Sequence, residues 1–280
     1  MILRLPDAME RKEDSMKEKQ MAKVLSQREI APGIFDMWIE TSLAGQAAAG
    51  QFICVYPRDK STLLPRPISI CEVRDDRGAL RIVYRVAGKG TAEFSSYREG
   101  ESIAVLGTLG NGFPVQSARE KENTRVFLMG GGIGIPPMLQ LAKELAGLGM
   151  KKENLQIVVG YRDAQNFLRE DLERYGSVFV ATEDGSVGTR GNVMDAVTKN
   201  GLLADVIFAC GPMPMLRAIK QYAAQAQIPA YISLEEHMAC GVGACLGCVV
   251  KTGEIDHHSH VHNARICTDG PVFEAQTVEI

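Results

Sequence analysis

The stretch "RVFLMGGGIGIPPMLQLA", residues 125–142, decides one half of the fold. Its apolar run at 126–129 is typical of a strand that is buried on both faces of a parallel sheet. A glycine-rich loop follows at 130–134. The prolines after it suit the first turn of a helix, because an N–H group at that position has no partner within the helix and its loss costs nothing. Apolar residues then recur with a helical period at Met138, Leu141, Leu145 and Leu148. We therefore expect a buried strand, a tight loop and a helix with one apolar face.

The glycine-rich loop is a candidate nucleotide site. A loop between a strand and a helix presents free backbone N–H groups and the positive end of the helix dipole, which suits a pyrophosphate. The match to G-x-G-x-x-G is incomplete, because Ile135 takes the place of the third glycine and no acidic residue follows at the next strand end. A plain tight turn is the alternative. However, "FACGPMPML", residues 208–216, repeats the order of strand, glycine and helix, so two strand ends can meet one ligand.

Two zones of different composition make up most of the chain. Over 122–230 strand-like and helix-like segments alternate, which predicts a parallel α/β domain. Over 22–118 short strands are broken by glycine and proline, as in "GQFICVYP" (50–57), and no helical period separates them. We expect an antiparallel barrel or sandwich there. The predicted fold class is thus multi-domain, all-β followed by α/β, with a small loop-rich unit at 231–280.

Composition excludes several classes of protein. The chain has 280 residues, a net charge of −3 and a pI near 6.0, whereas nucleic-acid-binding proteins usually carry a basic excess. No run of roughly eighteen apolar residues is present, so we expect no membrane span. Residues 1–21 hold charges of both signs and no apolar signal-peptide core, which predicts a mobile tail and a cytoplasmic protein. In that reducing compartment, the seven cysteines are expected to be thiols or metal ligands.

Three cysteines crowd into "HMACGVGACLGCVV", residues 237–250. The spacing Cys240-x4-Cys245-x2-Cys248, with Cys267 further along, matches the plant-type [2Fe–2S] pattern. Glycines between these cysteines let the backbone wrap tightly enough for its N–H groups to reach cluster sulfurs. A structural zinc site is the alternative, but such sites usually come as two C-x2-C pairs, and only one is present.

Other candidate ligands have plainer explanations. Cys54 and Cys71 lie in strand-like stretches, where a buried cysteine acts as a small hydrophobic residue. The histidine-rich stretch 257–262 lacks the spacing of a Rieske site, so we expect a solvated loop rather than a metal site.

Three motifs point to a family by their order: "RPISI" (66–70), "GGGIGIPPM" (130–138) and "CGPMPM" (210–215). This order resembles the ferredoxin–NADP reductase superfamily. In that superfamily a β-barrel holds a flavin and an α/β domain holds a nicotinamide nucleotide. The resemblance therefore favours a barrel over a sandwich for the first domain.

The C-terminal stretches narrow the resemblance. With "SLEEHMACGVGACLGC" (233–248) and "CTDGPVF" (267–273), the chain resembles the electron-transfer subunits of the NAD-linked dihydroorotate dehydrogenase B family from residue 22 to its end. The resemblance implies FAD in the β-barrel at 22–118, NAD(H) on the α/β domain at 122–230, and a [2Fe–2S] cluster in 231–280.

Site residues follow from the same resemblance, position by position. FAD contacts are implied for Arg66, Pro67, Ile68, Ser69, Val83, Tyr84, Arg85, Gly90 and Thr91. Arg66 would neutralise a phosphate, for which a planar guanidinium is suited, and Ser69 would lie near the flavin ring. NADH would be received by Gly131, Gly132 and Gly134, with Cys210 and Gly211 close to the nicotinamide. The cluster ligands would be Cys240, Cys245, Cys248 and Cys267. No catalytic acid or base is expected, because the flavin performs the redox chemistry.

The implied activity is electron transfer in pyrimidine biosynthesis. A hydride would pass between NAD(H) and FAD, and single electrons between FAD, the cluster and the FMN of a PyrD-type catalytic subunit that oxidises dihydroorotate. The two kinds of chain would form a heterotetramer, without nucleic acid or membrane. Arg162 follows the second strand of the α/β domain, where it could meet a ribose 2′-phosphate, so NADP stays open.

Two alternatives remain at this point. A ferredoxin–NADP(+) oxidoreductase or a sulfide dehydrogenase flavin subunit would look similar, but such chains typically carry aspartate where this one has Cys240. A non-catalytic, zinc-stabilised nucleotide-binding module is the second alternative, and it predicts a protein without pigment.

Overall fold

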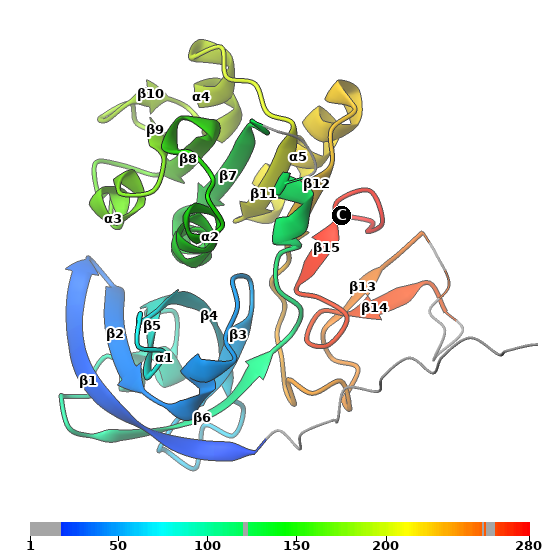
Figure 1. The fold of residues 1–280 in the computed structure, drawn as a ribbon. Coiled ribbons are helices and arrows are strands. Elements are labelled where there is room, and N and C mark those ends of the chain that lie inside the picture. The colour runs from blue at the N-terminus through cyan, green and yellow to red at the C-terminus, as the bar shows by residue number, and fades with distance from the viewer. Residues whose placement is uncertain (1–17, 120–122, 254, 256–260) are drawn as a thin grey trace, which may run out of the picture.

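In the computed structural model, which describes residues 18–119, 123–253, 255 and 261–280, the first six strands close into an antiparallel barrel (Figure 1). The strands are β1 (Lys19–Ala31), β2 (Ile34–Glu40), β3 (Phe52–Tyr56), β4 (Arg66–Val73), β5 (Ala79–Arg85) and β6 (Ser102–Leu109). Their order around the barrel is β1-β2-β5-β4-β3-β6. The predicted barrel is confirmed.

Side chains alternate between two surfaces along β3. Ile53 and Val55 are buried in the barrel core, whereas Phe52 and Cys54 pack with residues from the rest of the chain. This alternation follows from the two-residue period of a strand. One strand therefore closes the barrel core and also offers an apolar outer surface to the C-terminal half.

Short helical pieces in the N-terminal part differ from the expectation of strands and turns alone. They are η1 (Ser42–Gly45), α1 (Lys89–Phe94) and η2 (Val115–Arg119). Helix α1 begins inside the Gly-Lys-Gly-Thr stretch, with Gly88 as its N-cap, three residues after the end of β5. It was not predicted, because six residues are too few to show a helical period.

A seven-stranded sheet with the order β10-β9-β8-β7-β11-β12-β15 forms the second domain. Its parallel strands are β7 (Val126–Gly131), β8 (Leu155–Tyr161), β9 (Ser177–Thr182), β10 (Thr189–Arg190), β11 (Val206–Cys210) and β12 (Ala230–Ser233). The helical segments are η3 (Gly132–Gly134), α2 (Pro136–Gly147), η4 (Lys152–Asn154), α3 (Arg169–Glu173), α4 (Val193–Lys199) and α5 (Met213–Ala226). The predicted parallel α/β domain is confirmed.

Helix α2 begins at Pro136, as the sequence predicts. Met138, Leu141 and Leu145 are fully buried on its apolar face. Leu148 was expected on the same face, but α2 ends at Gly147 and Leu148 lies exposed beyond it. The pattern of apolar residues in the sequence therefore extends one residue past the end of the helix.

The last fifty residues leave the sheet and return to it. A hairpin of β13 (Val249–Lys251) and β14 (Asn263–Arg265) projects from the body, and β15 (Val272–Glu274) then pairs antiparallel with β12 at the sheet edge (Figure 1). The segment expected at 231–280 therefore supplies β15 and most of β12 to the second domain. Residues 1–17 of the predicted tail and 256–260 of the histidine-rich stretch lie outside the described residues.

Helix α2 lies on the side of the sheet that faces the barrel (Figure 1). Apolar residues from both domains meet there, among them Cys71 and Val83 of the barrel and Met138, Leu139 and Ala142 of α2. In the part of the chain that the structure describes, no helix has the length and apolar character needed to cross a bilayer.

Candidate functional site

A cavity of about 470 Å³ opens where the barrel, the glycine-rich loop and the segment after β12 meet. Its wall consists of Phe52, Pro67, Ile68, Ser69, Val83, Tyr84, Arg85, Ala87, Ile133, Ser233, Leu234, Glu235, Glu236, His237, Met238 and Pro271. Most of this wall is apolar, with a few polar groups at defined places, as in sites for organic cofactors. Its size falls within the usual range for such sites.

Six of the residues predicted to contact FAD lie in this wall. They come from the adjacent strands β4 and β5 and are Pro67, Ile68, Ser69, Val83, Tyr84 and Arg85. Arg66, Gly90 and Thr91 do not line the cavity. A Cβ added at Gly90 would lie 3.0 Å from Cζ of Arg66, so the guanidinium lies directly against this glycine. The arginine and the Gly-Lys-Gly-Thr turn are therefore neighbours beside the cavity.

The phenol of Tyr84 is fixed by its surroundings. Its hydroxyl donates a hydrogen bond of 2.7 Å to Oε1 of Gln27, and its ring packs edge-on against Phe94. Burial raises the pKa of Tyr84 well above its ordinary value, so the hydroxyl stays protonated. Tyr84 is therefore a rigid, neutral part of the wall.

The two predicted dinucleotide loops touch each other. Strands β7 and β11 pair in parallel with Gly130 opposite Cys210. A Cβ at Gly134 would lie 2.3 Å from the carbonyl oxygen of Cys210, and one at Gly131 would lie 2.7 Å from Sδ of Met215. At Gly134 the backbones approach too closely for any side chain, whereas a Cβ at Gly131 would press on the side chains of Met215 and Pro212. The predicted glycines therefore lie where the loops after β7 and β11 touch each other.

Only Ile133 of the glycine-rich loop reaches the cavity wall. Gly132 has a φ of +53°, and a Cβ there would lie 3.5 Å from Nη2 of Arg85, so the loop faces the barrel across the cavity. Cys210 is fully buried, and burial raises the pKa of its thiol far above the ordinary value. Its thiol hydrogen-bonds with Ser233, which lines the cavity. Cys210 therefore lies behind the wall as a neutral group.

The four predicted cluster ligands lie together at the start and end of the projecting hairpin. Cys245 is exposed, Cys240 is half-buried, and Cys248 and Cys267 are buried. Cys240 is within hydrogen-bonding reach of Cys245, and Cys267 is within reach of Cys248. Among the described residues, no three ligand side chains converge as one metal ion requires. Two pairs of sulfurs fit a centre with two irons, one iron for each pair.

Backbone donors surround the first of these sulfurs. Burial alone would raise the pKa of Cys240, but N–H groups of Val242, Cys245 and Ala244 lower it to about 7. Burial and the hydrogen bond with Cys248 instead raise the pKa of Cys267 to about 12. The backbone donors around Cys240 therefore favour its thiolate form, which is the form that binds a metal.

The cluster loop rests on the barrel. A Cβ at Gly241 would lie 2.8 Å from Sγ of Cys54, and Gly241 has a φ of +71°. In the next strand, Pro67 is the register partner of Cys54 and lines the cavity. Met238 also lines the cavity, only two residues before Cys240. One short segment therefore joins the cavity wall to the cysteines.

Several wall residues were not predicted from the sequence. They are Phe52, Ala87, Ile133, Pro271 and the stretch 233–238. Their residue types carry no motif, and they meet only because β12, β15 and the barrel fold together. The order "SLEEHM" directly before the first cysteine was the one available signal, since a segment that links two cofactors must contact both.

Comparisons with known proteins agree with this architecture. Residues 235–279 match the family model described as "Iron-sulfur cluster binding domain of dihydroorotate dehydrogenase B", and residues 128–221 match "Oxidoreductase NAD-binding domain". The chain is similar to the structure titled as the NADH-dependent reduced ferredoxin-NADP oxidoreductase, with 29% identity, a TM-score of 0.79, and coverage of 92% of this chain and 89% of that one.

Two curated relatives match almost from end to end. Both are named "Dihydroorotate dehydrogenase B (NAD(+)), electron transfer subunit". The one from Listeria welshimeri is 41% identical over 92% of this chain and 98% of its own length. The one from Streptococcus pneumoniae is 41% identical over 91% of this chain and 96% of its own length. The chain therefore belongs to the family of electron transfer subunits of dihydroorotate dehydrogenase B.

Proposed function

We propose that this chain transfers electrons between NAD(H) and a partner flavoprotein that oxidises dihydroorotate. The cavity would bind the flavin, and the four cysteines would bind the iron–sulfur cluster. The observation that carries the proposal is the continuity of 233–248, which lines the cavity at Met238 and reaches the first cysteine at Cys240. When bound, FAD exchanges a hydride with NAD(H), and a [2Fe–2S] cluster exchanges single electrons with FAD and with the FMN of the partner subunit.

The barrel side of the cavity would hold and orient the flavin. Pro67, Ile68 and Val83 supply apolar contact, and Ser69 supplies a hydroxyl at the wall. Arg66 lies against Gly90, where its guanidinium can neutralise a phosphate beside the exposed backbone of the Gly-Lys-Gly-Thr turn. The residues present therefore fit a flavin that carries a phosphate-linked tail.

The opposite side would receive the dinucleotide. The contact between the loops at Gly134 and Cys210 places the glycine-rich loop and the start of α2 beside the second strand end, and the positive end of the α2 dipole there suits a pyrophosphate. The first two residues of α2 are prolines without an N–H group, so the backbone donors would come from the glycine-rich loop. Ile133 then separates this loop from the flavin cavity. Arg162 follows β8 and is exposed, so a comparison of NADH with NADPH as donors tests the preference expected for NAD(H).

Electrons would leave on the side of Cys245. Exposed apolar side chains lie within four residues of this exposed cysteine in the sequence, at Val242, Leu246 and Val249. A short distance to the partner requires a cluster close to the surface, and exposed apolar residues are typical of a contact surface. We propose that the FMN-containing catalytic subunit binds here, in a heterotetramer.

The expected compartment and domain limits belong to the same proposal. All seven cysteines are free thiols, in agreement with a reducing cytoplasm. The barrel at 22–118 would be the FAD domain, 122–230 the NAD domain and 231–280 the cluster unit, although the last also completes the α/β sheet.

Anaerobic purification together with the FMN-containing subunit tests the proposal. The expected product is red-brown, contains FAD and about two irons per chain, and reduces NAD with dihydroorotate as donor. Ferredoxin or sulfide as the only effective electron partner would favour the sibling oxidoreductases instead. A colourless protein that carries zinc and no flavin would contradict the relay altogether.

A further inference from the structure

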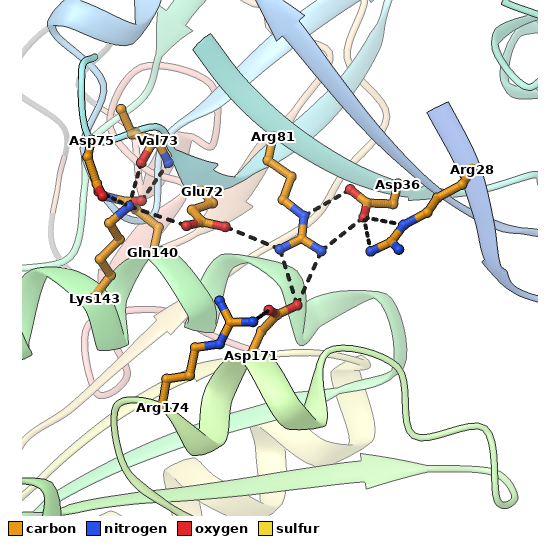
Figure 2. A network of polar contacts seen from close by, with 10 residues as sticks. All are labelled: Arg28, Asp36, Glu72, Val73, Asp75, Arg81, Gln140, Lys143, Asp171 and Arg174. Carbon is orange, nitrogen blue, oxygen red and sulfur yellow. Dashed lines mark hydrogen bonds and ion pairs between the residues drawn. The ribbon is translucent and has the colours of Figure 1, made fainter. Parts of the chain in front are cut away.

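A network of charged side chains lies between the barrel and the α/β domain (Figure 2). At its centre is Arg81 of β5, whose side chain is only 6% exposed. Arg81 forms two hydrogen bonds of 2.9 Å with Asp36 and an ion pair of 3.1 Å with Glu72, both within the barrel. Burial alone would lower the pKa of Arg81, but the hydrogen bonds with Asp36 raise it, so the guanidinium stays charged.

Two side chains of the α/β domain enter this network. Asp171 of α3 accepts hydrogen bonds of 3.2 Å from both terminal nitrogens of Arg81. Lys143 of α2 lies 3.2 Å from Glu72 and 2.6 Å from Asp75, and its ammonium donates to the carbonyl oxygen of Val73. Figure 2 shows both side chains pointing from their helices to the barrel. The two domains are thus joined by charge pairs at two separate points.

A neutral contact accompanies these charges. Gln140, which is 3% exposed, accepts a hydrogen bond of 2.7 Å from the backbone N–H of Val73. Its amide donates to Glu144, which also accepts from the backbone N–H of Ala49. Successive turns of α2 therefore bind the backbone of the barrel at 49 and 73.

The position of α2 decides where the glycine-rich loop lies. The helix begins at Pro136, two residues after Gly134, and Ile133, the residue directly before Gly134, lines the cavity. A helix is stiff along its axis, so a rotation of α2 on the barrel would shift Ile133 relative to the wall at Ser69. Placement of the dinucleotide loop over the flavin is therefore coupled to the contacts at the far end of α2.

We propose that Lys143 and Asp171 are positioning residues that hold the dinucleotide loop at the correct distance from the flavin. This inference rests on the proposed function. These ion pairs are partly buried, with side-chain exposures of 22% for Asp171, 21% for Lys143 and 18% for Glu72. Such a pair adds little net stability, because desolvation of the charges offsets their attraction, but it favours one arrangement of the two domains. Both partners come from the α/β side, so their removal still leaves Arg81 paired with Asp36 and Glu72.

The double variant Lys143→Met with Asp171→Asn tests the proposal in the purified complex. We expect the rate of flavin reduction by NADH, measured by stopped flow, to fall roughly 10- to 100-fold, as small misplacements of reacting groups typically cause. The long-wavelength absorption that reports contact between nicotinamide and flavin should weaken in parallel. The flavin content, the cluster spectrum and the flavin midpoint potential should stay as in the wild type. Lys143→Arg with Asp171→Glu keeps both charges and should recover most of the rate.

Arg169→Ala is the matched control, because it removes an exposed ion pair with Glu173 inside the same domain. It should leave the rate of flavin reduction unchanged. An unchanged rate in the double variant, or an equal loss in Arg169→Ala, would overturn the positioning role. Loss of the bound flavin in the double variant would also overturn the positioning role, since the network would then serve only to stabilise the folded protein. Wild-type protein without flavin would instead refute the proposed function itself.

Discussion

The flavin cavity and the cysteine loop share a segment, yet they are built from different kinds of structure. One side of the cavity wall comes from β3, β4 and β5 of the barrel, and the other side comes from loop residues, mainly the stretch 233–238 at the edge of the α/β sheet. The stretch 234–248, which carries three of the four predicted ligands, contains no helix or strand. Its fixed points are the close contact of Gly241 with Cys54 and the N–H groups around Cys240.

This difference indicates what holds each site. Strand pairing and the apolar interface between the domains fix the barrel side of the cavity. The cysteine loop has no strand pairing between 234 and 248, so we expect bonds from its sulfurs to a bound cluster to contribute much of its order. The two sites should therefore respond differently to substitution, and the following predictions test that contrast.

Cys245→Ser should give the largest effect. We expect loss of the cluster and of transfer to the partner subunit by more than the roughly 10- to 100-fold typical of outer-shell changes around a metal. Oxidation of NADH by an artificial acceptor should persist, because the flavin cavity does not include Cys245. Iron content, visible absorption and both activities measure this. Cys71→Ala, at a buried cysteine of the barrel, should keep the cluster. Survival of both activities in Cys245→Ser would contradict the relay.

Gly134→Ala should damage the dinucleotide side of the cavity. The new Cβ would meet the backbone of Cys210 and Gly211 at 2.3–2.6 Å, and backbone cannot yield as a flexible side chain can. We expect a loss of about 1–3 kcal/mol in the free energy of unfolding and a higher KM for NADH, while the cluster is retained. Gly147→Ala is the matched control. Its Cβ meets nothing within 4 Å in the last turn of α2, so it should be neutral or slightly stabilising. Equal effects of both variants would refute the close approach.

Gly241→Ala should weaken the cysteine loop without affecting the cavity. Its left-handed φ costs roughly 1–2 kcal/mol for a residue with a Cβ, and that Cβ would press on Sγ of Cys54. We expect faster loss of the cluster absorption under a chelator, with unchanged flavin content. Addition of Cys54→Ala should relieve the steric part and slow the loss again. Gly253→Ala, where no atom of the described residues lies within 4 Å of the new Cβ, should behave as wild type.

Lys143→Met should have the smallest effect on stability, and that effect should depend on pH. Burial lowers the pKa of Lys143, but Asp75 and Glu72 raise it overall above 10.5, its ordinary value. A raised folded-state pKa means that the stabilisation is complete below pH 10.5 and is lost as the pH rises through the folded-state value. Thermal melts should show a difference of about 1 kcal/mol or less from wild type near neutral pH, which shrinks in strongly alkaline buffer. A difference that grows with pH would contradict these ion pairs.

Much of the fold could be predicted from short stretches of sequence. The run at 126–138 encodes a buried strand, a tight loop and a proline-started helix, and the structure has all three. These features depend on local backbone geometry and on the spacing of apolar residues. Both are set by residues that are close together in the sequence. Helix α1 was missed because it is too short for a period, and β15 because three residues gain a strand's hydrogen bonds only from a distant partner.

The site could be predicted only where its residues carry motifs. "RPIS" and the cysteine spacing indicate which chemistry to expect, and the family they point to is confirmed by relatives with 41% identity. The stretch 233–238 was missed, although it forms a large part of the cavity wall. Glutamate, histidine and methionine in a loop have many ordinary roles, and only their position between two domains makes them part of a site.

The sulfur spacing, the glycine-rich loop and the order of strand and helix follow from the amino-acid sequence, because each depends on residues close together along the chain. The contact of the cysteine loop with Cys54, and those of Lys143 and Asp171 with the barrel, exist only in the folded chain. Residues on the two sides of these contacts are about 70 or more positions apart, and no local pattern encodes which distant charges or surfaces will meet.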